Sequence, residues 1–178
     1  MQEVQEILEN TSLRLASRKY ATEFILSKNL LPQTIELIKF PQELSIKAWM
    51  IIEMLGSDNC EILGEFMSTI INSAKLYSDG SSKRCMIKIF SFLIESHFHK
   101  NSPIHLNHAE IKETIRLSFQ FLMNDQKTAV KVFAMQNVYD LRTEEKWIES
   151  ELKALLEKDI SASTSGYRSR ALKILRKL

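Results

Sequence analysis

The sequence predicts an all-helical protein. Its 178 residues include only four glycines and three prolines, which leaves few positions for the tight turns of a β-sandwich or a β-barrel. Leucine and isoleucine are abundant whereas valine is rare, a balance typical of helices because leucine loses little rotamer freedom there. No stretch shows the sustained apolar/polar alternation of a half-buried strand. The length indicates a single domain over residues 1–178, since domains commonly hold about 100 to 200 residues.

Helical periodicity, read together with caps and breakers, divides the chain into about ten helices. They form five consecutive pairs. Pro41 separates the two helices of the second pair, and the turn-forming residues 78–81 separate those of the third. The expected pairs are 2–10 with 13–28, 31–40 with 43–55, 60–77 with 82–97, 108–123 with 126–139, and 143–158 with 167–178.

Local signals mark several helix ends in the second half of the chain. Asn107 stands three residues before Glu110, a spacing that predicts a capping box at the start of a helix. Thr143, followed by two glutamates, predicts another helix start because acidic side chains complement the helix dipole. The stretch 97–107 is the longest irregular segment, and 161–166 is the clearest linker.

A small residue recurs early in the second helix of the last four pairs. These residues are Ala48, Cys85, Ala129 and Ala171, and they lie 37, 44 and 42 residues apart. Apolar residues follow four positions later, at Ile52, Ile89, Phe133 and Leu175. A period of this length is expected of helix pairs that cannot bury their apolar faces alone and stack on their neighbours.

This pattern resembles the HEAT and armadillo repeats, and the segments 147–149 and 166–175 resemble the C-terminal cap of small bacterial HEAT-like proteins. The resemblance covers nearly the whole chain. It implies an alpha-alpha superhelix, a right-handed solenoid of about five antiparallel pairs, with the second helices lining the concave side and 167–178 as a capping helix. An irregular helical bundle with accidental spacing is the alternative.

Charge separates between the two classes of helix although the whole chain carries only +2. The second helices, counted over 14–28, 44–55, 82–95, 126–139 and 167–178, hold 15 lysines and arginines and three glutamates, a balance of +12. The expected first helices balance at −6. A solenoid would place the second helices on one side, which predicts a basic concave surface for an acidic partner. The alternative is that these side chains only satisfy helix ends and acidic neighbours. The candidate binding residues are Lys47, Lys83, Arg84, Lys88, Lys127, Lys131, Arg168, Arg170 and Lys173.

The last helix concentrates both features. Tyr167, Ala171 and Ile174 begin one apolar stripe that continues through Leu175 and Leu178. Five basic residues cover the rest of the helix. Elsewhere in the chain, Trp49 is expected in the core. We expect such a helix to cap a repeat stack rather than to bind a membrane.

The four histidines lie close together in the sequence but do not form a metal-binding motif. His97 and His99, two apart, point away from each other on a helix, and no HExxH or Cys/His signature accompanies His105 and His108. The two cysteines, Cys60 and Cys85, lack zinc spacing and are expected to be small buried residues. We therefore expect no metal and no cofactor, with the four histidines as the only candidate ligands.

Parts of the sequence resemble two classes of enzyme, but each lacks residues that its chemistry needs. Residues 80–83, Gly-Ser-Ser-Lys, resemble the start of the serine loop of the fumarase and adenylosuccinate lyase superfamily, but the Met-Pro and Lys-x-Asn that follow in that family are absent. HEAT-like DNA glycosylases of the alkylation-repair type use aromatic and acidic groups in a basic cleft, and no aspartate occupies a second-helix interior here.

We therefore expect a non-catalytic binding or scaffold module that contacts a protein partner, such as an acidic segment, through its basic face. Nucleic-acid binding, including a repair-type glycosylase, is the alternative. The N-terminal residues 1–6 have neither a basic start nor an apolar core, and no run approaches the roughly 20 apolar residues of a membrane span, which predicts a cytoplasmic protein.

Overall fold

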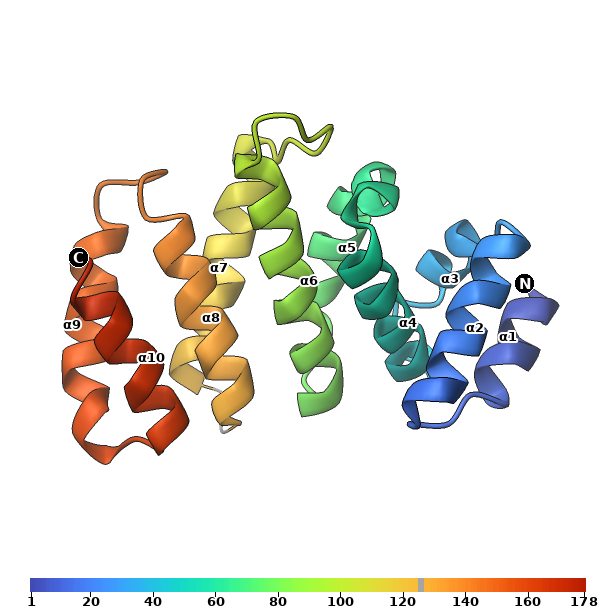
Figure 1. The fold of residues 1–178 in the computed structure, drawn as a ribbon, viewed down its shortest axis with the longest axis horizontal. Coiled ribbons are helices and arrows are strands. Elements are labelled where there is room, and N and C mark those ends of the chain that lie inside the picture. Colours follow the sequence, from blue (N-terminus) through green and yellow to red (C-terminus); the bar gives the residue numbers. More distant parts are fainter. Residues whose placement is uncertain (125–126) are drawn as a thin grey trace. The chain divides into compact units, whose positions relative to one another are not determined.

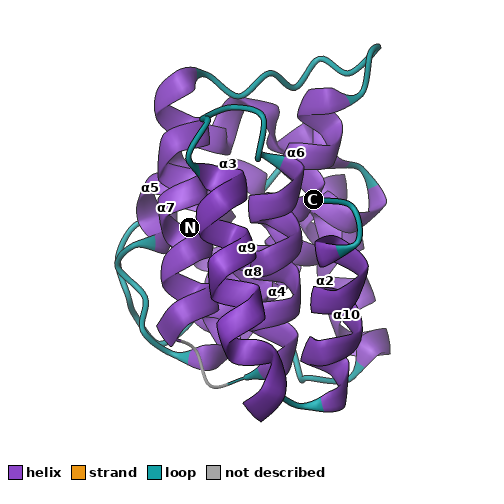
Figure 2. Cartoon of the chain, turned by 90° about the vertical axis from the view of Figure 1, so that its left-hand side faces the viewer, coloured by secondary structure: helices purple, strands orange, loops and turns teal. Residues whose placement is uncertain are grey.

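The structure, a computed structural model, describes residues 1–124 and 127–178, apart from the side chain of residue 162. Within these residues it contains ten α-helices and two short 3-10 helices, joined by loops, and no strand (Figure 2). The prediction of an all-helical fold is confirmed. In the part of the chain so described, no helix is both long and apolar enough to cross a membrane. The helices cluster into two units, residues 1–105 and 106–178.

The first unit is organised around α4, which packs against both α2 and α6. Its core holds Trp49, which is fully buried as predicted and meets Tyr77 edge-on with ring centroids 5.5 Å apart. The Tyr77 hydroxyl donates a hydrogen bond of 2.9 Å to the carbonyl of Ile38, which ties the end of α3 to the end of α5. The elements are α1 (Gln2–Glu9), α2 (Leu15–Ser27), α3 (Leu31–Glu36), α4 (Ser45–Asp58), η1 (Cys60–Phe66), α5 (Met67–Ala74) and α6 (Gly80–Phe98) (Figure 1).

The second unit is organised around α8, which contacts α7, α9 and α10. The capping box predicted at residues 107–110, at the start of α7, is confirmed. The backbone amide of Glu110 donates to Asn107 Oδ1 at 3.0 Å, and the backbone amide of Asn107 donates to Glu110 Oε2 at 2.9 Å. The predicted stripe of the last helix is confirmed at Tyr167, Ala171 and Ile174, which are buried, whereas Leu175 and Leu178 are only partly buried and Leu178 lies beyond the helix. The elements are α7 (His108–Asn124), α8 (Thr128–Asp140), α9 (Ile148–Asp159), η2 (Ile160–Ala162) and α10 (Ser165–Leu175).

Several predicted boundaries are wrong. The helix expected over 60–77 is broken into η1 and α5, where Leu63 of η1 packs so closely on α4 that a Cβ at Gly56 would lie 2.8 Å from its Cδ1. The helix expected from Thr143 begins at Ile148, which is the first fully buried residue of its apolar face. The helix expected over 31–40 ends at Glu36. The expected start at residue 126 lies outside the described residues.

Of the four small residues expected to pack closely between helices, three are buried and one is not. Ala48, Cys85 and Ala171 are fully buried, whereas Ala129 is exposed. Val130, one residue later, and Ala134 are fully buried in its place. One residue corresponds to a rotation of about 100° on a helix, which is enough to turn a core position toward solvent. The small-residue pattern therefore does not extend to α8.

Candidate functional site

Basic side chains gather around a hollow between α8 and α10 in the second unit. Its volume is about 290 Å³, and four of its seven lining residues are lysines or arginines. Because Tyr167, Ala171 and Ile174 turn the apolar face of α10 inward, the charged residues between them project outward. This hollow, the α8–α10 pocket, is lined by Gln136, Tyr139, Arg170, Lys173, Ile174, Arg176 and Lys177.

A short polar network fixes one wall of this pocket. The Arg170 guanidinium donates to Gln136 Oε1 at 2.9 Å, and the Gln136 amide donates to Asp140 Oδ1 at 2.8 Å. Beside it, the Arg142 guanidinium lies 4.1 Å from the ring centroid of Tyr139, within the range of a cation–π contact. Asp140 is thus the acidic end of this network, and Gln136 lies between it and Arg170.

The structure brings two of the predicted residues, Arg170 and Lys173, into this pocket. The prediction missed Gln136 and Tyr139, which α8 contributes at a spacing of three residues. Only their helical spacing in the sequence could have indicated that they share a face.

The other predicted residues of the second unit lie elsewhere. Arg168 donates from its guanidinium to the carbonyls of Ile160, Ser161 and Ser163 at 3.3 to 3.5 Å, and so closes the turn before α10. Lys131 lies 5.8 Å above the Tyr167 ring, and Lys127 is the exposed N-cap residue of α8.

In the first unit, the predicted residues Lys47, Arg84 and Lys88 have internal partners. The Lys47 ammonium donates to the carbonyls of Leu8 and Glu9, both at 2.8 Å, and so satisfies the end of α1. Arg84 and Lys88 both pair with Glu53, the former at 3.7 Å. Lys83 is half-buried near the start of α6. The contacts of Lys47, Arg84 and Lys88 therefore match the alternative expectation, in which basic side chains satisfy helix ends and acidic neighbours.

Glu53 is the centre of a buried polar cluster between α4 and α6. Burial raises the pKa of its carboxyl group, but hydrogen bonds from Cys85 and Lys88 and the charges of Lys88 and Arg84 outweigh burial and leave the pKa below its usual value. Burial and the adjacent Glu53 raise the pKa of the Cys85 thiol far above its usual range. Cys85 is therefore a protonated, fully buried residue, as predicted, whereas Cys60 is only partly buried.

The separation of charge between helix classes persists with the observed boundaries, although it is smaller. Counted over α2, α4, α6, α8 and α10, the balance is +5, and over the remaining helices it is −8. The decrease has two causes: five of the basic residues counted before, among them Arg176 and Lys177, lie just beyond helix ends, and α4 and α8 extend to include Asp58 and Asp140. The basic excess is carried mainly by α10, with +3.

The histidines are not gathered around one point. Among the described residues, no group of three or more histidine, cysteine, aspartate or glutamate side chains is placed to hold a metal ion. His97 and His105 have ring centroids 6.2 Å apart at an angle of 77°. His99 is the C-cap residue of α6, and His108 opens α7.

Residues 80–83, which resemble the start of a lyase serine loop, form the first turn of α6. The Asp79 carboxylate caps this turn and accepts hydrogen bonds from the amides of Ser81 and Ser82 at 3.0 and 2.8 Å. Ser82 is fully buried. A capped helical turn with a buried serine differs from the flexible loop that the lyase chemistry uses.

The arrangement in the α8–α10 pocket suits the binding of an anion. Its lining offers cationic donors and no carboxylate, histidine or cysteine that could act as a base or nucleophile. Comparisons of the chain with protein-family models, with curated proteins and with solved structures find no match. Function therefore has to be inferred from the fold and from the chemistry of its surfaces.

Proposed function

We propose that this protein is a non-catalytic, HEAT-like helical-repeat module that binds an acidic segment of a protein partner. The observation that carries the proposal is the convergence of Arg170, Lys173, Arg176 and Lys177 on the α8–α10 pocket. Carboxylates accept strong, charge-assisted hydrogen bonds from such donors. A short stretch of aspartate or glutamate would place its side chains among these four cations.

The spacing of long-range contacts supports the repeat part of the proposal. In the first unit, the hydrogen bonds of Lys47 and Tyr77 connect residues 38 or 39 positions apart. In the second unit, Arg170 reaches Gln136 across 34 positions, and the hydroxyls of Thr128 and Thr164 meet across 36. Contacts of this range join one helix pair to the next, as stacked repeats require. The neighbouring packing of α2, α4 and α6 is consistent with the same arrangement.

An acidic protein segment fits this surface better than a nucleic acid. Duplex binding depends on many phosphate contacts along a continuous basic track, whereas Lys47, Arg84 and Lys88 hold internal acceptors. Trp49, the one tryptophan on the helices expected to line the concave side and so the candidate aromatic group of a repair-type glycosylase, is fully buried. The pocket on the second unit is small and local, which suits a short peptide.

The test measures binding of a fluorescently labelled octapeptide of aspartate and glutamate, and of a labelled 20-base-pair duplex, over a range of salt concentrations. The variant Lys173→Glu with Lys177→Glu reverses two pocket charges. Its matched control, Lys153→Glu with Lys158→Glu, reverses two exposed lysines of α9 in the same unit. We expect the pocket variant to weaken peptide binding at least about tenfold, which corresponds to roughly 1.4 kcal/mol, and the control to bind as the wild type does.

Equal losses in both variants would show that binding follows net charge alone and would refute the pocket. Tighter binding of the duplex, with an affinity that falls steeply and linearly in the logarithm of salt concentration, would instead establish the nucleic-acid alternative.

A further inference from the structure

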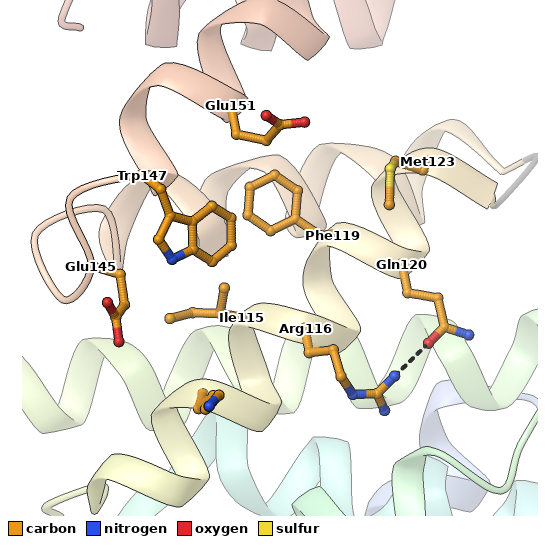
Figure 3. A pocket seen from close by; sticks show the side chains of 9 residues that line it. Ile115, Arg116, Phe119, Gln120, Met123, Glu145, Trp147 and Glu151 are labelled. Carbon is orange, nitrogen blue, oxygen red and sulfur yellow. Dashed lines mark hydrogen bonds between the residues drawn. The ribbon is translucent and has the colours of Figure 1, made fainter.

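A second hollow, on a different face of the second unit, lies between α7 and the segment that enters α9 (Figure 3). Its volume is about 520 Å³, within the range of about 300 to 1,000 Å³ that is common for ligand pockets. It shares no residue with the α8–α10 pocket. The α7–α9 groove is lined by Lys112, Ile115, Arg116, Phe119, Gln120, Met123, Glu145, Trp147 and Glu151.

The floor of the groove is apolar and partly open to solvent. Ile115, Phe119 and Met123 lie four residues apart on one face of α7. The indole of Trp147 stacks on Phe119 with ring centroids 5.5 Å apart and 28° between the planes. Trp147 is 50% exposed and Met123 is 52% exposed, so large apolar side chains face solvent around one hollow. Exposed apolar residues gathered in this way mark interaction sites.

The two sides of the groove carry opposite charges. Arg116 projects from α7, whereas Glu145 and Glu151 come from the segment around the start of α9 (Figure 3). Lys112, which also lines the groove, lies on α7 four residues before Arg116. Arg116 is held in place by two hydrogen bonds to Glu113, at 2.7 and 2.8 Å, and by one of 3.2 Å to Gln120. Because Glu113 offsets the charge of Arg116, the α7 side carries one net positive charge, from Lys112. The groove therefore presents an apolar floor between this basic side and an acidic side.

We infer that the α7–α9 groove docks an amphipathic helix of a partner protein, with basic residues along one flank of its apolar stripe and acidic residues along the other. The floor residues of α7 span eight positions, about 12 Å at 1.5 Å per residue, which matches the reach of two to three turns of a docked helix. The basic flank of that helix meets Glu145 and Glu151, and its acidic flank meets Lys112 and Arg116. The order of the flanks sets the direction in which the helix lies.

Shape and charge distinguish this occupant from two others. A second copy in a two-fold symmetric dimer would set one groove against another, and two concave surfaces leave space between them rather than filling it. A small apolar molecule would use the floor but neither charged side. The inference does not depend on the proposed function, because the two surfaces have no residue in common.

The probes are three designed 14-residue helical peptides with the same leucine stripe. One carries lysines on one flank and glutamates on the other, one carries glutamates on both flanks, and one carries lysines on both. Emission of Trp147 reports binding, because Trp49 is fully buried. For the first peptide we expect saturable binding with a blue shift of the emission. Its affinity should be at least about threefold higher than that of either peptide with one sign of charge, which corresponds to an interaction of about 0.65 kcal/mol.

Exposed residues provide the variants, so that the fold is kept. Met123→Asp is expected to weaken binding of the first peptide at least about tenfold, whereas Leu172→Asp, a similarly exposed position on α10, leaves it unchanged. Glu151→Lys should weaken the first peptide and favour the one with glutamates on both flanks. The Lys173→Glu, Lys177→Glu variant should bind all three peptides as the wild type does, which separates this site from the α8–α10 pocket.

Three results would overturn the inference. Equal affinity for the three peptides would show that the charged sides play no part. Binding of the apolar dye anilinonaphthalene sulfonate that Met123→Asp abolishes, without binding of any peptide, would assign the groove to a small apolar ligand. Self-association in sedimentation experiments that Met123→Asp abolishes would assign it to a second copy of the chain.

Discussion

Replacing Lys88 with methionine tests the ion pair at the centre of the first unit. Methionine keeps most of the apolar stem but removes the ammonium, so Glu53 retains only Arg84 as a cationic neighbour, 3.7 Å away. Losing one partner of a fully buried pair costs about 3–5 kcal/mol, whereas an exposed pair contributes about 0.2–1 kcal/mol. The Glu53 side chain is 8% exposed but that of Lys88 is 27% exposed. We therefore expect a loss of about 2 kcal/mol in the free energy of unfolding, between these two limits.

The loss should depend on pH in a defined direction. In the wild type, Glu53 has a pKa below its usual value of 4.5, so its contribution to stability is present above pH 4.5 and is lost as the pH falls through the native pKa. In the variant, burial acts with less opposition and the pKa of Glu53 rises. Protonation then relieves the uncompensated charge, and the difference between the two proteins should narrow as the pH falls below the raised pKa of Glu53 in the variant.

The assay is urea unfolding followed by the emission of Trp49, which lies on the same helix as Glu53, in a Trp147→Phe background. The double variant Glu53→Gln with Lys88→Met leaves no buried charge without its partner, so it should recover much of the loss. A loss below about 0.5 kcal/mol at pH 7, the size typical of a surface substitution, would refute the reasoning. So would a loss that is the same at pH 7 and pH 4.

Two further predictions concern the helices. Asn107→Ala removes the acceptor of the capping box at α7 and should cost about 1 kcal/mol in urea unfolding; an unchanged midpoint would show that Glu110 or water replaces the cap. Gly56→Ala should destabilise by about 1–3 kcal/mol because its Cβ would lie 2.8 Å from Leu63 Cδ1. Gly166→Ala, whose Cβ has ordinary contacts, should instead stabilise α10 by about 0.5–1 kcal/mol; equal effects on thermal midpoints at the two glycines would contradict this contrast.

The helices that the sequence predicted best are those with local signals. The amide and carboxylate of the capping box at 107 and 110 are only three residues apart, so their interaction can be inferred without knowledge of the fold. The apolar stripe of α10 is likewise contained within one helix. Its inward face and its exposed basic face both follow from a period of 3.6 residues.

Features that depend on contacts between helices could not be predicted in the same way. Ala129 and Val130 both suit a helix, and only packing against α8's neighbours decides which of them faces the core. The partner of Lys88 is Glu53, 35 residues away, and nothing in the sequence near either residue indicates the pairing. Trp147, the N-cap residue of α9, stacks on Phe119 of α7, and no local signal near either residue indicates that contact.

The sequence distance covered by the long-range hydrogen bonds bears on how the protein folds. Bonds from Lys47, Tyr77 and Arg170 each close a loop of 34 to 39 residues. The entropy lost on loop closure grows only with the logarithm of loop length, and a topology rich in contacts of limited range favours rapid folding. During synthesis, a helix pair can meet its contact partners once about one further pair has left the ribosome. Folding within each unit can then keep pace with translation.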